Sequence, residues 1–170
     1  NTTRDLLLRF LALGVFTPLM RNHSATRTRE QEFYQFEDPQ DFAAVIGVRY
    51  RLLPYLYSEY MKAALGDDLY FKPLAFTYSD DAVARHLPEE MIFVKFLADG
   101  TILQEKWEKG WHFAEVALNE VPLFIRKDHK IPVVDVAEYV DAINMTTLQY
   151  IGYTDADYEL YTDDGITPIA

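Results

Sequence analysis

The chain has 170 residues, of which 49% are hydrophobic and 25% are charged, so it can form one domain, or two small ones, with a buried core. Its net charge is −11, so it lacks the basic surface that nucleic-acid binding requires. The same negative charge disfavours contact with an anionic membrane. The absence of cysteine excludes disulfides and thiolate metal sites. No apolar run approaches the roughly 18 residues of a membrane span and the first residues do not resemble a signal peptide, so we expect a cytoplasmic protein.

The first half of the chain predicts helices followed by a strand. Residues 3–14 place leucines at helical spacing and end at a glycine, which predicts a helix, and residues 15–37 are mostly loop. Residues 40–65 predict a long amphipathic helix that Pro54 should kink. Residues 69–78 predict a strand interrupted by a proline, and a helix followed by a buried strand is typical of β/α architecture.

The second half predicts short antiparallel strands. Residues 91–97 alternate apolar and polar side chains, an Asp-Gly turn follows, and residues 102–107 form the returning strand of a hairpin. A short helix is predicted at residues 134–143. Further strands are predicted at 111–118, 121–126, 148–153 and 158–161. The pattern favours an antiparallel β-sandwich, and we place the boundary so that the domains are residues 1–86 and residues 87–170.

The loop after the first helix holds the strongest candidates for a binding site. It contains the segment Met-Arg-Asn-His-Ser, in which the neutral imidazole of His23 can both donate and accept a hydrogen bond. Arg21, Arg29 and Glu30 either form a network that supports this loop or lie in solvent. We favour the network, because a loop with few apolar anchors needs such bonds.

Other chemistry-bearing residues have a simpler explanation. Adjacent carboxylates, such as Asp80 and Asp81, are typical of turns and helix caps. The segment from Asp155 to Glu159 lacks the glycine that a calcium loop requires, and the histidines lack metal-ligand spacing, so we expect no metal and no cofactor. Trp107 and Trp111 could form a sugar-stacking platform, but packing of a hairpin by its aromatic side chains is the preferred interpretation.

Several longer motifs carry a resemblance to a known family. In chain order they are RNHS at residues 21–24, RYRLLPYLY at 49–57, FKPLAF at 71–76, NEVPLFIR at 119–126 and LYTDDG at 160–165. They resemble, in the same order, segments of glycoside hydrolase family 31, the α-glucosidases and their relatives. The resemblance implies an α/β plus all-β fold, the end of a (β/α)8 TIM barrel followed by an antiparallel β-sandwich domain. It also implies that His23 contacts the sugar in the −1 subsite and that Lys72, where the family commonly has arginine, supports the pocket.

The chain departs from the family pattern in two ways. The nucleophile and acid/base aspartates of the family have no counterpart here, so we assign no catalytic residue. The eighth barrel strand, which normally lies between the segment ending at Asp81 and Leu87, has no counterpart either.

The leading hypothesis is part of a retaining α-glucosidase that cleaves terminal α-linked glucose from an oligosaccharide substrate. This chain would supply sugar-binding and scaffold residues. The alternative is a non-catalytic interaction or carbohydrate-binding module, or an inactive fragment. A barrel strand with two unpaired edges should seek a missing upstream barrel segment or self-associate.

Overall fold

The structure, a computed structural model, describes residues 2–27, 31–79 and 86–163. Helix α1 (Arg4–Gly14) begins where the Thr3 hydroxyl accepts a hydrogen bond from the backbone N–H of Leu6, a typical N-cap. Its leucines at positions 7, 8 and 11 are buried, as the helical spacing predicts. Both the helix and its end at Gly14 confirm the sequence-based prediction.

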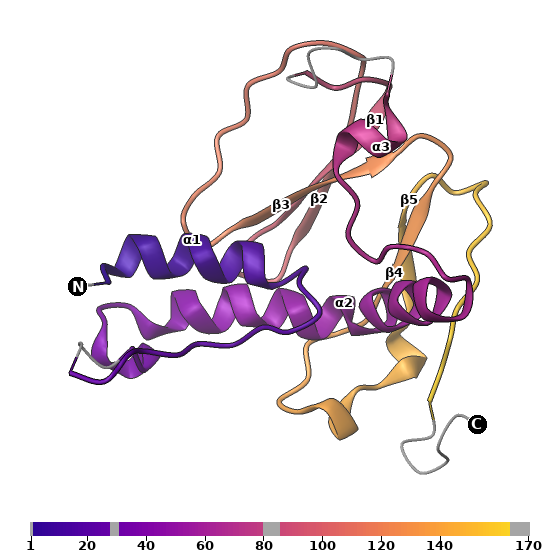
Figure 1. Cartoon of the computed structure of the whole chain (residues 1–170). Coiled ribbons are helices and arrows are strands. Elements are labelled where there is room, and N and C mark those ends of the chain that lie inside the picture. Colours follow the sequence, from indigo (N-terminus) through magenta and orange to yellow (C-terminus); the bar gives the residue numbers. More distant parts are fainter. Residues whose placement is uncertain (1, 28–30, 80–85, 164–170) are drawn as a thin grey trace.

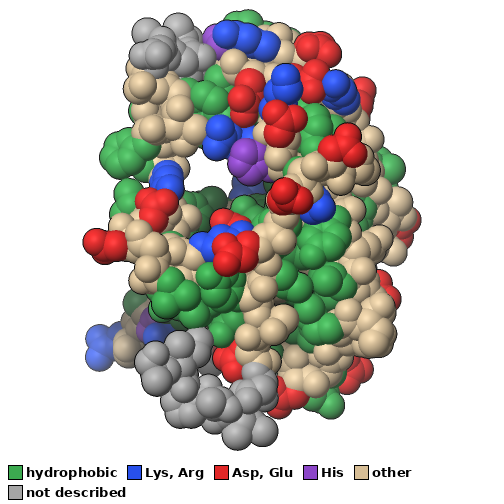
Figure 2. All heavy atoms as spheres, turned by 90° about the vertical axis from the view of Figure 1, so that its right-hand side faces the viewer, with side chains coloured by type: hydrophobic (Ala, Val, Ile, Leu, Met, Phe, Trp, Pro, Cys, Tyr) green, Lys and Arg blue, Asp and Glu red, His purple; other side chains and the backbone are tan. Residues whose placement is uncertain are grey.

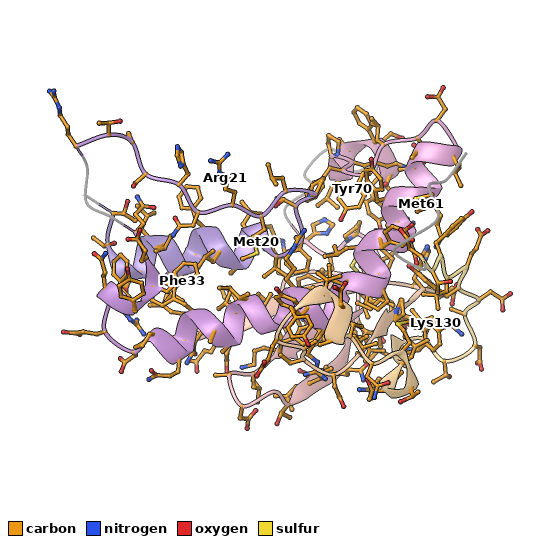
Figure 3. All side chains as sticks on the ribbon, turned by 90° about the horizontal axis from the view of Figure 1, so that it is seen from below. Met20, Arg21, Phe33, Met61, Tyr70 and Lys130 are labelled. Carbon is orange, nitrogen blue, oxygen red and sulfur yellow. The ribbon has the colours of Figure 1, made fainter. Side chains whose placement is uncertain are left out.

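Helix α2 (Pro39–Leu65) is the longest element and lies beside α1 (Figure 1). Pro39 stands in the first turn, where its missing N–H has no intrahelical acceptor to lose. Pro54 lies inside the helix and removes one backbone hydrogen bond there. Figure 3 shows that the turns around Met61 run in a different direction from the first half of the helix, as expected for a helix that contains proline.

The strand predicted at residues 69–78 is wrong. The described residues there form no strand, and a single helical turn, α3 (Leu74–Thr77), follows Pro73. A strand in a β/α fold exists only when neighbouring strands accept and donate its backbone hydrogen bonds. Without such neighbours among the described residues, this segment leaves its apolar side chains in solvent. The exposed side chains are Leu69, Phe71, Leu74 and Phe76.

Three strands form the first antiparallel sheet in the order β2-β1-β3. They are β1 (Met91–Phe96), β2 (Ile102–Trp107) and β3 (Val121–Arg126). The β1–β2 hairpin turns at Gly100, whose φ of 89° suits a residue without a side chain. In the register, Phe93 stands between Glu105 and Phe124. The predicted hairpin and the predicted strand at 121–126 are therefore confirmed.

A second sheet pairs β4 (Lys130–Val133) with β5 (Gln149–Gly152), again antiparallel. Strand β5 confirms the prediction at 148–153, whereas β4 was not predicted. The strands predicted at 111–118 and 158–161 are wrong, because the described residues there are extended chain without strand pairing. The helix predicted at 134–143 is reduced to a 3-10 turn, η2 (Val140–Ala142). The remaining 3-10 turns are η1 (Phe33–Gln35) and η3 (Met145–Thr147).

One hydrophobic core joins the helices to both sheets. It includes Leu8 of α1, Phe42 and Leu52 of α2, Phe96 of β1 and Val133 of β4, all at most 1% exposed. In the described residues we therefore see two long helices packed on two small antiparallel sheets. A complete barrel and a complete sandwich are not seen in this part of the chain, and the division at residue 86 stays a prediction. None of the described helices is long and apolar enough to span a membrane.

Candidate functional site

The loop that follows α1 holds the predicted sugar contact. It turns at the end of α1 and runs back along α2 (Figure 1). Met20 packs against the hydrophobic core, while Arg21 points away from the helices (Figure 3). Arg21 and His23 are both exposed. An imidazole held on an exposed loop keeps both ring nitrogens available for hydroxyl groups.

The far side of this loop is tied down next to His23. The side-chain amide of Asn22 donates a hydrogen bond of 2.5 Å to the carbonyl of Gln31, and the Gln31 amide donates one of 2.7 Å to the Thr2 hydroxyl. Asn22 and Gln31, which lie on either side of His23 in the sequence, are thereby connected to each other and to Thr2 just before α1. Arg29 and Glu30, predicted to support the loop, lie outside the described residues.

Lys72, the fourth predicted supporting residue, lies on a different part of the surface. Its ammonium group forms an ion pair with Asp68, and hydrogen bonds from Lys72 and from the Leu69 backbone lower the pKa of that carboxyl. Lys72 also borders a cleft of about 590 Å3, whose lining includes neither Arg21 nor His23. The structure therefore brings Arg21 and His23 together on one loop and places Lys72 apart from them.

The cleft lies between α2, strands β3 and β4, and residues 157–159. Figure 2 shows a hollow on this face with acidic, basic and histidine side chains around its opening. Inside it, Glu59 accepts hydrogen bonds of 2.9 Å from both Lys62 and Tyr158. Burial, and then the nearby Glu59 carboxylate, raise the pKa of Tyr158, so its hydroxyl remains a donor at neutral pH. Glu59 is thus committed to hydrogen bonds inside the protein, and we assign it no catalytic role.

The tryptophan platform suggested by the sequence does not form. The ring of Trp107 stacks on Phe93, at 4.4 Å between centroids, and on His112, at 4.7 Å. It packs against aromatic neighbours of the protein, which agrees with aromatic packing of the hairpin. Among the described residues, no group of three or more potential metal ligands could hold an ion.

Two arginines of α2 that were not among the predicted site residues bond to the backbone of other segments. Arg49 donates to backbone carbonyls at the start of the His23 loop, and Arg51 donates to Gly100 and Val134 beside the sheets. The signal for them was an Arg-Tyr-Arg sequence in a helix whose neighbouring positions are mostly apolar. Charged side chains at such positions need buried hydrogen-bond acceptors.

Comparisons with known proteins identify the class of this chain. Residues 1–59 match the family model described as the glycosyl hydrolases family 31 TIM-barrel domain, which places the chain among the glycoside hydrolases. It is 28% identical over 194 residues to alpha-glucosidase 2 of Bacillus thermoamyloliquefaciens, covering 98% of this chain and 25% of that protein. It is 42% identical over 111 residues to a probable alpha-glucosidase of Oryza sativa subsp. japonica, covering 65% of this chain and 12% of that protein. The chain belongs to glycoside hydrolase family 31.

A third relative is named for a different activity. The chain is 25% identical over 192 residues to an alpha-xylosidase of Saccharolobus solfataricus, covering 96% of this chain and 26% of that protein. The chain thus spans between 12% and 26% of the length of these three relatives. The two long alignments exceed the 170 residues of the chain, so residues of those relatives face gaps in it. A missing eighth barrel strand would produce such a gap.

Proposed function

We propose that this chain is the sugar-recognising part of a retaining α-glucosidase. His23 contacts the terminal glucose, and Arg21 on the same loop supports this contact. The two carboxylates that flank the scissile bond in a retaining enzyme come from barrel residues outside the described structure. The observation that carries the proposal is the exposed imidazole of His23, presented by a loop that is anchored on both sides of it.

The apolar surface of α1 supports a larger barrel as the partner of this chain. Leu6, Phe10 and Leu13 are 46%, 65% and 61% exposed, although the opposite side of the same helix is buried in the core. A helix of a (β/α)8 barrel packs one side against strands, and contiguous apolar surface marks an interaction site. We propose that the upstream barrel strands of the enzyme cover this surface.

Binding of a small glycoside tests the sugar contact directly. Methyl α-D-glucoside should shift the imidazole carbon–proton signals of His23 during an NMR titration of the chain, and His23→Ala should abolish the binding. His112→Ala is the matched control, because His112 is also exposed and stacks on Trp107 away from this loop. Unshifted His23 signals at saturating glycoside would refute the proposed contact.

Turnover by an enzyme that contains this chain tests the catalytic role. His23→Ala should lower kcat/KM for p-nitrophenyl α-D-glucoside at least about tenfold, equivalent to about 1.4 kcal/mol of lost transition-state binding. Comparing the α-glucoside with the corresponding α-xyloside decides between the two substrate classes that the relatives' names include. Unchanged kcat/KM would contradict the assignment of His23.

A further inference from the structure

We propose that Arg49 is the positioning residue of the sugar loop, holding the backbone that leads to His23 in its binding conformation. This inference rests on the proposed sugar contact of His23. It adds a residue from a different helix that touches no substrate and acts through the loop.

The guanidinium group of Arg49 contacts backbone carbonyls at four of the five residues from Gly14 to Pro18. One of its terminal nitrogens donates to the carbonyls of Val15 at 2.9 Å and Thr17 at 2.8 Å, and lies 3.4 Å from that of Gly14. The other terminal nitrogen donates to the carbonyl of Pro18 at 3.2 Å. Because a guanidinium is planar and its N–H groups point in fixed directions, these bonds determine the path of the backbone as well as its distance from α2.

The end of α1 explains why a cation is needed at this position. The last carbonyls of a helix have no intrahelical donor and carry the negative end of the helix dipole. The last turn of α1 contains no basic side chain of its own. Arg49 of α2 supplies this positive charge, and its N–H groups bond to the carbonyls of Val15, Thr17 and Pro18 directly after the helix.

Two other side chains complete the set of hydrogen bonds. The Thr17 hydroxyl donates to the carbonyl of Gly14 at 2.8 Å, and the Tyr70 hydroxyl donates to that of Phe16 at 3.3 Å. All carbonyls from Gly14 to Pro18 therefore accept a hydrogen bond from a side chain. The loop leaves this anchored section five residues before His23 and is anchored again at Asn22, so the position of the imidazole depends on Arg49.

Amide hydrogen exchange tests the positioning role without any ligand. The N–H groups of Val15, Phe16 and Thr17 bond to carbonyls at the end of α1, so their exchange reports the order of this section. Arg49→Ala should accelerate their exchange at least tenfold, and Arg49→Lys should give an intermediate effect because it keeps the charge and loses the fork. Arg9→Ala, which removes an exposed arginine from α1, should leave these rates unchanged.

The glycoside titration separates this proposal from the proposed function. Faster exchange together with at least tenfold weaker binding of methyl α-D-glucoside, partly restored in Arg49→Lys, is the expected result. Unchanged exchange in both variants would overturn the positioning role, as would faster exchange with unchanged affinity. If the wild-type chain does not bind the glycoside, the proposed function fails, and exchange alone decides whether Arg49 orders the loop. Should Arg49→Ala unfold the chain, Arg49→Lys carries the test.

Discussion

Arg51 offers a sharp test of how the helices are joined to the sheets. It is 8% exposed, and its guanidinium donates to the carbonyl of Val134 at 3.2 Å and to that of Gly100 at 2.5 Å. It also lies 5.7 Å from the ring centroid of Phe96. Burial lowers the pKa of Arg51, and the Asp135 carboxylate partly opposes this shift.

Replacing Arg51 by methionine keeps an apolar stem and removes both hydrogen bonds. Hydrogen bonds to a charged group contribute roughly 1.5–3 kcal/mol each. The Gly100 turn is exposed, so water can replace part of what its carbonyl loses. We therefore expect the free energy of unfolding to fall by about 3 kcal/mol, near the lower end for two such bonds.

Urea denaturation followed by two probes measures this change. Far-UV circular dichroism reports mainly on α1 and α2, whereas fluorescence reports on Trp107 and Trp111, which both lie beyond residue 86. The two curves should coincide in the wild-type chain and separate in Arg51→Met. Arg9→Ala is the matched control and should change the free energy by less than about 0.5 kcal/mol, as surface substitutions do. A loss below about 1 kcal/mol with coincident curves would refute the proposed connection.

Two further substitutions test other contacts between distant segments. Ser58 is fully buried, and its hydroxyl accepts a hydrogen bond of 3.0 Å from the Tyr161 N–H. Ser58→Ala should therefore lower the free energy of unfolding in urea by about 1–2 kcal/mol and accelerate exchange of the Tyr161 amide. Unchanged exchange would contradict this contact. Burial alone would raise the pKa of Glu89, but hydrogen bonds from Tyr78 and Arg126 lower it overall. A carboxyl with a lowered folded-state pKa stabilises the fold above its unfolded pKa of about 4.3, and this contribution is lost as the pH falls through the folded value. Glu89→Gln should therefore be less stable than wild type at pH 7, with the difference shrinking below about pH 4.3; a difference that is constant down to pH 2 would exclude this linkage.

The parts of the fold that sequence predicted correctly are those set by local patterns. Helical spacing of apolar residues places α1 and α2, and the Asp-Gly turn between alternating segments places the β1–β2 hairpin. The incorrect strand at 69–78 has strand-like composition but depends on partners that are absent from the described residues. Strand β4 was overlooked because its four residues include a proline and follow a charged turn, and only pairing with β5 makes it a strand.

The residues of the candidate site also differ in whether a local sequence pattern indicates them. His23 is predicted from a short contiguous motif, and its sugar contact stays a prediction. The anchoring role of Arg49 joins residues 34 positions apart at Val15, and that of Arg51 joins residues 83 positions apart at Val134. No local pattern encodes such contacts, since they depend on which elements pack together.

These two arginines give α2 a structural role that neither its composition nor its length indicates. Residues two positions apart on an α-helix point about 200° from each other, so Arg49 and Arg51 face opposite sides of the helix. One side holds the start of the His23 loop, and the other holds the hairpin turn and the residue after β4. The position of the sheets relative to His23 is therefore set by one buried helix. A binding site keeps its geometry when its loop is anchored to a rigid element, and here that element is α2.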